Sequence, residues 1–374
     1  GNEEELYGAR QNTKSDVQKT YDAVEWVSEH YPDSFILPNH PSRHNNGNEV
    51  VDNGEVTIEN LRTMNDIDPN VVFGFEGMPG NQLDPSCELP ADDLRAGADE
   101  MISVTGGVWD ALLSEGRRFY NFANSDFHFK ISSSEQYSSG YWASEFSRNY
   151  TWVEPGDDQQ FTFSDVVEGM RSGNSYSVNG ELISDLSFTV SDGKGSATMG
   201  QDLNVGEGDE ITVTIQFKIP EHNNYQSLYN TDTGLNADNT PDVDHVDLIM
   251  GHVTGKVDQS QYSSTANTDA RIVKTFTKEE LAAARGEDGV YTLTYTTTAD
   301  SDLYFRVRGL SSSEVDENGD PVTHERTVTD QRPARFDYIN DYNYTHLSFY
   351  GNPVWVNVEK APERQTQGEE NGSA

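Results

Sequence analysis

The sequence predicts two consecutive folds, an α/β region followed by an antiparallel β-sandwich. In the first half, short apolar segments alternate with amphipathic helical segments, and each apolar segment leads into a polar cluster. This order is typical of α/β domains, whose strand ends carry functional groups. After Gly180 the apolar residues follow strand patterns instead. We therefore expect an α/β part over residues 1–179, a sandwich over 180–360 and a disordered tail over 361–374.

The elements of the α/β part follow from its apolar spacing. Residues 15–30 place their apolar side chains on one helical face, which Ser15 or Asp16 can cap and Pro32 ends. Further elements are predicted as strands at 35–37, 71–75 and 119–123 and as helices at 108–115 and 161–173. Each predicted strand runs into polar residues, so side chains capable of chemistry are expected to gather at one edge.

The second half has the pattern of a sandwich. Strands are predicted over residues 186–190, 211–219, 246–250, 291–297 and 303–307. Residues 211–219 keep a strict period of two, which predicts one buried and one wet face. One helix interrupts the strands, with Thr277 and Glu280 as a capping box and Gly286 at its end.

The charge balance excludes some partners. The chain has 374 residues, with 25 Lys and Arg against 64 Asp and Glu, a net charge of −39. Nucleic acids and anionic membranes need a basic surface, so neither is expected as a partner. The balance favours a solvated, salt-tolerant surface of the kind that marine or halophilic secreted proteins have; an acidic coat that binds calcium is the alternative.

Export and membrane signals are few. Cys87 is the only cysteine, so no intrachain disulfide can form, and no stretch is long enough for a membrane helix. The start, GNEEE, shows no signal-peptide pattern, and we expect a processed or truncated N-terminus.

Three predicted strand ends carry candidate metal ligands. Asp126 and His128 are two residues apart, so they point the same way on an extended chain, and this pair suits zinc, manganese or iron. The alternative is a simple surface pair. His40 follows the first predicted strand and could instead be a loop or capping histidine. Glu76 lies on a glycine-flanked turn and could instead be a buried carboxylate satisfied by backbone donors.

Two acidic loops in the second half could bind calcium. The larger cluster comprises Asp232, Asp238, Asp242, Asp244 and Asp247. Oxygen ligands suit calcium, but the spacing lacks the glycine and closing glutamate of an EF-hand, and a solvated loop is the alternative. Asp316, Asn318 and Asp320 form a weaker candidate.

Several segments, in order, resemble one enzyme class. They are residues 37–43 (LPNHPSR), 74–82 (GFEGMPGNQ), 109–118 (WDALLSEGRR), 124–128 (NSDFH), 168–173 (EGMRSG), 180–183 (GELI) and 349–356 (FYGNPVWV). Together they are similar to the later motifs of metallohydrolases of the polymerase-and-histidinol-phosphatase (PHP) class. The branch they most resemble is that of secreted bacterial phosphoesterases related to the carbaryl-hydrolase type.

The resemblance implies a ligand set and a fold. His40, Asp126 and His128 would bind metal, and Glu76 would bind it or orient a ligand. The fold implied for residues 1–179 is the C-terminal part of a distorted PHP-type α/β barrel. Two or three divalent transition metals (Zn, Mn or Fe) would be the cofactors.

The resemblance also implies substrate contacts and a location. Arg43 would meet an anionic substrate oxygen, unless it forms a structural ion pair, and Asn39 and Asn81 would line the substrate site. Asn81 stands where the family pattern has a histidine, and the family's opening His-x-His is absent. The missing ligands would come from a separate N-terminal fragment or from another copy of the chain. Such proteins are secreted, to the extracellular space or the periplasm.

The function expected is therefore metal-dependent hydrolysis of a small phosphate ester. A carboxylester or carbamate hydrolase on the same scaffold is the first alternative, because a fold does not fix its substrate. The second is a non-catalytic extracellular binding or structural protein with an incomplete metal site, which the absent His-x-His and Asn81 favour.

Overall fold

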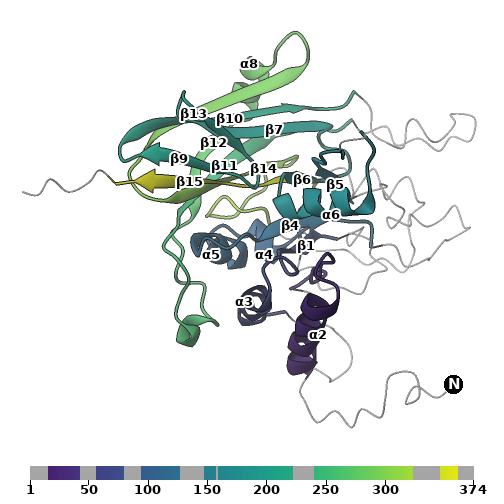
Figure 1. The fold of residues 1–374 in the computed structure, drawn as a ribbon. Helices are drawn as coiled ribbons and strands as arrows, with labels where there is room; N and C mark the ends of the chain where they lie inside the picture. The colour runs from purple at the N-terminus through teal and green to yellow at the C-terminus, as the bar shows by residue number, and fades with distance from the viewer. Residues whose placement is uncertain are drawn as a thin grey trace, which may run out of the picture.

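The chain folds into three stacked layers (Figure 1), two β-sheets and a layer of helices and short strands. The computed structural model describes residues 16–42, 56–79, 94–126, 147–156, 159–221, 240–322 and 346–360. None of the helices in these ranges is long and apolar enough to cross a membrane.

The two sheets form the sandwich. The outer sheet has the antiparallel order β13 (Val290–Ala299), β10 (Asp209–Lys218), β7 (Asp185–Ser191), β8 (Ser196–Thr198). The central sheet has the order β12 (Arg271–Phe276), β11 (His245–His252), β14 (Leu303–Leu310), β15 (Ser348–Glu359), β6 (Ser175–Asn179), β5 (Ser147–Thr151), and β9 (Asp202–Gly206) pairs with β15 in parallel. Because β5 and β6 belong to this sheet, it crosses the boundary expected at residue 179.

The third layer, called the α/β layer here, covers the far face of the central sheet. Its elements are α2 (Asp16–His30), α3 (Ile58–Ile67), β1 (Gly74–Met78), β2 (Leu94–Arg95), β3 (Ala98–Asp99), α4 (Glu100–Ser103), α5 (Val108–Ser114) and β4 (Tyr120–Ala123). Two further helices, α6 (Phe163–Ser172) and α8 (Lys278–Ala284), flank the sheets, and the 3-10 helix η2 (Gln259–Gln261) lies beside α3.

Burial patterns explain this stacking. Along β10 the residues alternate between buried and exposed or half-buried, as the period of two predicts, because the outer sheet has one face in water. β6 and β14 are buried at every position. In β14, Phe305 and Val307 enter the sandwich core, while Tyr304 joins the core of the α/β layer. The central sheet is thus covered on both faces.

The parallel part of the molecule is short. β1 pairs with β4 in parallel, and a parallel bridge joins Asn39 to Glu76 on the other side of β1. The segment expected as a strand at 35–37 is not a continuous strand, because Pro38 has no N–H to extend a ladder. Two backbone hydrogen bonds tie this segment to residues 71–76: Ile36 N donates to Val71 O, and Glu76 N donates to Pro38 O. Within the described residues the sheets are mainly antiparallel and form no closed barrel.

Most sequence-predicted elements are confirmed, with two displacements. α2, α5, α6, α8 and β4 lie where the apolar spacing placed them, and Thr277 and Glu280 form the expected capping box. β1 begins three residues later than expected, because the N–H groups of Val71 and Val72 bond to Asp68 O. The apolar face expected for residues 161–173, which comprised Phe163, Val166, Val167 and Met170, is only partly buried: Phe163 is 80% exposed, whereas Val167 is buried as expected.

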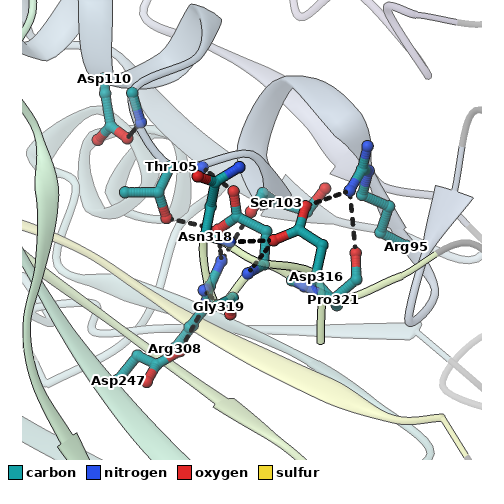
Figure 2. Close-up of polar contacts among 12 residues, drawn as sticks. Arg95, Ser103, Thr105, Asp110, Asp247, Arg308, Asp316, Asn318, Gly319 and Pro321 are labelled. Atoms are coloured by element: carbon teal, nitrogen blue, oxygen red, sulfur yellow. Dashed lines mark hydrogen bonds and ion pairs between the residues drawn. The ribbon is translucent and has the colours of Figure 1, made fainter. Parts of the chain in front are cut away.

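Buried arginines join the layers. Arg306 of β14 donates from Nε and Nη2 to both oxygens of Asp110 on α5, each at 2.7 Å, and both side chains are fully buried. Arg308 of β14 bonds Asp247, Asp320 and the Ser103 carbonyl (Figure 2). These contacts fix the helices of the α/β layer on the sandwich.

A second contact comes from residues 253–270, the connection between β11 and β12, which extends down to α3 in Figure 1. Arg62 of α3 donates from Nη1 to the carbonyl oxygens of Gln261, Tyr262 and Ser264 at 3.1, 2.6 and 2.7 Å. Its Nε donates to Glu115 at 2.7 Å. The sandwich therefore reaches the far side of the α/β layer through this connection.

Candidate functional site

Three adjoining parallel segments end at the same edge of the α/β layer. His40 follows the segment paired with β1, Glu76 lies within β1, and Asp126 follows β4. The carboxyl ends of parallel strands are where sites assemble in α/β folds. His40 and Asp126 thus follow parallel segments as predicted, whereas Glu76, predicted on a turn after its strand, lies inside β1 because the strand begins at Gly74.

Glu76 is the centre of this edge. Glu76 is 1% exposed, and its Oε2 accepts a hydrogen bond from His40 N at 3.1 Å. Its Oε1 is buried and has no hydrogen-bond partner among the described residues. Burial, and next the nearby charge of Asp126, raise the pKa of Glu76 to about 8, against the lowering effect of the His40 N–H and the Asn124 side chain. A carboxylate in this position needs a positive partner to stay ionised.

The two flanking residues have strained backbones. His40 has a φ of 32° and Asp126 a φ of 49°, both in the left-handed region that side chains other than glycine rarely adopt. Asp126 N donates to Asn124 Oδ1 at 2.7 Å, which closes a tight turn after β4. Such conformations cost about 1–3 kcal/mol each and cluster at functional sites.

Asp99 is a residue that sequence reasoning missed. It ends β3, caps α4 and is 1% exposed. Burial raises the pKa of Asp99 to about 7, against the lowering effect of hydrogen bonds from Met101 and Ser42. The charge of Asp99 also raises the pKa of Glu76, so the two carboxyls lie within electrostatic reach. Asp before a short apolar segment is a helix N-cap signal, and that signal could have located it.

The other predicted site residues are placed only in part. Asn39 is exposed and forms the backbone bridge to Glu76. Arg43, Asn81 and His128 lie outside the described residues. Within the described ranges, no group of three or more His, Cys, Asp or Glu side chains is arranged to hold a metal.

The carboxylates of the expected calcium loops have partners within the protein where they are described. Asp232 and Asp238 lie outside the described residues. Asp242 pairs with Lys278 at 2.5 Å and Asp244 with His245 at 2.9 Å. The described carboxylates of this predicted calcium site therefore already pair with side chains of the protein.

Asp247, the last member of that cluster in the sequence, is buried and accepts from Arg308 Nε at 3.0 Å and from Thr275 Oγ1 at 2.6 Å. In the weaker candidate loop, residues 316–320, a buried aspartate is likewise paired with Arg308. There Asp320 is buried against Arg308 Nη1 at 2.8 Å and Thr105 N at 2.9 Å (Figure 2). In both places the Arg308 guanidinium supplies the positive charge.

Comparison of the chain with protein-family models, with curated proteins and with solved structures gives no match. The geometry of the strand-end edge is therefore the main basis for a function.

Proposed function

We propose that this chain forms part of a metal-dependent hydrolase of phosphate esters, with its protein ligands at the edge where Glu76 of β1 lies beside the turns that carry His40 and Asp126. The observation that carries the proposal is the Glu76 carboxylate: it is buried, has one oxygen without a partner among the described residues, and lies near Asp126. Two neighbouring carboxylates in a desolvated place are stabilised by a divalent cation.

The donor types fit a transition metal. Carboxylates and a neutral imidazole are the ligands that zinc, manganese and iron take in hydrolases. Glu76 and Asp126 would supply oxygen, and His40 nitrogen. His128, which follows Asp126 by two residues, is the further ligand that the sequence pattern favours. Two or three ions would lower the pKa of a bound water and polarise the ester.

The chain's own residues would set the geometry of this site. The His40 N–H bond to Glu76 Oε2 ties the end of one segment to the neighbouring strand, so the two ligands are positioned relative to each other. Arg43 lies three residues after His40, where its guanidinium would pair with an anionic substrate oxygen. Asn39 and Asn81 would contact the substrate.

The resemblance to the PHP class supports the choice of substrate and fold. On that resemblance, the parallel segments of the α/β layer would be the C-terminal part of a distorted PHP-type barrel. The remaining ligands would come from an N-terminal segment or a second copy, and the protein would be secreted to the extracellular space or periplasm. A small phosphate ester is then the substrate, with a carboxylester or carbamate next to test.

Metal binding and hydrolysis test this function together. Chelator-stripped protein is titrated with Zn²⁺, Mn²⁺ or Fe²⁺, bound metal is measured by elemental analysis, and nitrophenyl phosphate mono- and diesters are compared with nitrophenyl acetate and a nitrophenyl carbamate. Glu76→Gln and Asp126→Asn are expected to lose metal and phosphate-ester hydrolysis together. Glu279→Gln on exposed α8 makes the same charge change elsewhere and should alter neither.

The outcomes separate the alternatives. Cleavage of the acetate or carbamate alone would replace the phosphoesterase proposal with that hydrolase. Metal that remains bound in both site variants would place the ligands elsewhere. A wild-type chain that binds no transition metal would overturn the enzyme proposal in favour of a binding or structural role.

A further inference from the structure

The turn that carries His40 is held at both ends by buried carboxylates. His40 N donates to Glu76 Oε2 at 3.1 Å, and Ser42 N donates to Asp99 Oδ2 at 3.1 Å. Between them, Pro41 has a fixed φ, and its carbonyl oxygen accepts from Val56 N at 2.9 Å. The backbone of these three residues is therefore tied to three separate parts of the α/β layer.

Asp99 is itself rigidly placed. It lies at the junction of β3 and α4, and its Oδ1 accepts from Met101 N at 2.9 Å as the cap of α4. Ser42, its other partner, is fully buried. An ionised acceptor makes stronger hydrogen bonds to backbone N–H groups than a neutral one does. The carboxylate thus uses one oxygen for its own helix and the other for the turn.

The backbone of His40 needs such support. A φ of 32° is unfavourable for any residue other than glycine, and it persists only where the surroundings determine it. Glu76 fixes the turn at His40 itself, but Glu76 is a proposed ligand. Asp99, at the start of α4, fixes the same turn at Ser42, two residues after His40, and is not itself a proposed ligand.

We propose that Asp99 is a positioning residue for this site: through the Ser42 N–H it holds the turn after His40 in the conformation that places the His40 backbone N–H against Glu76. This inference rests on the proposed function for its catalytic meaning. Its structural content, that one carboxylate caps α4 and holds the turn, stands separately and can be measured by itself.

Two substitutions separate the two bonds. Asp99→Ser keeps an N-cap, because serine Oγ accepts from Met101 N, but leaves no oxygen for Ser42. Asp99→Asn keeps the size and leaves one acceptor for two donors. Thr277→Ala is the matched control, because it removes the N-cap of α8 on the outer sheet without touching the α/β layer.

Hydrogen exchange of the Ser42 amide is the first measurement, and it needs no activity. Protection should fall by about tenfold or more in Asp99→Ser and Asp99→Asn and stay unchanged in Thr277→Ala. Unchanged protection in Asp99→Ser would overturn the proposal. If the wild-type chain bound no metal, the proposed function would fail, and the exchange result would still decide whether Asp99 holds the turn.

Metal affinity is the second measurement. Residues that orient a ligand typically change affinity by about 10- to 100-fold, so Zn²⁺ or Mn²⁺ should bind that much more weakly to both Asp99 variants. Hydrolysis should recover when excess metal is added, which a loss of folded protein would not allow. Loss of Ser42 protection with wild-type metal affinity would overturn the positioning role.

Discussion

Replacing Glu76 by Gln should remove a pH-dependent loss of stability from the metal-free protein. Burial, and then the charge of Asp126, raise the pKa of Glu76 from 4.5 to about 8. Between these two values the folded protein holds a proton that the unfolded chain releases. The free energy of unfolding therefore falls as pH rises through this window, and the fall ends above the folded pKa.

The size of this loss follows from the pKa difference. One group contributes about 1.4 kcal/mol per pH unit inside its window. From pH 5 to pH 8 the wild-type chain should therefore lose about 4 kcal/mol that Glu76→Gln retains. Asp99, whose pKa is raised to about 7, acts with the same sign and is present in both proteins; because its charge also raises the pKa of Glu76, the difference reports Glu76 together with its coupling to Asp99.

Urea unfolding of chelated protein across this pH range measures the effect. Tryptophan emission is a suitable signal, because Trp109 is fully buried in the α/β layer. Glu279→Gln on exposed α8 controls for a change in net charge. Added Zn²⁺ or Mn²⁺ should restore wild-type stability at pH 8 and leave Glu76→Gln unchanged. Parallel pH profiles for wild type and Glu76→Gln would refute the reasoning, because they would mean that Glu76 is no more costly to ionise folded than unfolded.

Three further predictions concern the scaffold. Arg62→Ala leaves Glu115 with Arg117 as its remaining partner and removes the donor to three carbonyl groups, so it should lower the free energy of unfolding by about 1–3 kcal/mol in urea titrations, whereas an exposed-site change such as Lys194→Ala should cost about 0–1 kcal/mol; equal costs would contradict the joining role. Gly173→Ala should cost about 1–3 kcal/mol or more, because its φ is 72° and a Cβ would lie 2.2 Å from the Tyr120 ring; a thermal midpoint equal to wild type would contradict this. With a net charge of −39, the thermal midpoint should rise with NaCl as self-repulsion is screened, and a midpoint independent of salt would show that the acidic surface does not strain the fold.

The sequence predicts elements best where one face is wet. β10 alternates strictly because water covers one side of the outer sheet, so its period of two is visible. The side chains of β6 also alternate between two faces, but both faces are buried, so the alternation does not separate buried from exposed residues. Tyr176 and Val178 enter the sandwich core, while Ser177 and Asn179 hydrogen-bond to other polar groups on the opposite side. A strand buried against a polar face has no apolar signal there, and β5 and β6 went unpredicted for that reason.

The candidate site shows a similar division. Its strand-end positions could be predicted, because apolar runs followed by polar clusters identify them without any tertiary contact. The electrostatics could not. The raised pKa of Glu76 depends on burial under other elements, and Asp99 meets Ser42 from 57 residues away. No local pattern encodes that distance, and only the fold brings the two residues together.

The sandwich is part of the scaffold for this edge. β4, which leads to Asp126, lies on the central sheet: Asn121 N donates to Asn352 Oδ1 at 2.8 Å, and Asn352 Nδ2 donates to Ser175 Oγ at 2.8 Å. Asn121 Oδ1 in turn accepts from Gly77 N, the residue after Glu76, at 3.1 Å. This chain of buried amides runs from β15 through β4 to β1. Because Asn352 is buried, removing its side chain alone would leave Asn121 N and Ser175 Oγ without this partner, at about 1–3 kcal/mol each. The strand ends therefore owe their geometry to residues more than 200 positions away, and the two halves of the sequence form one structural unit.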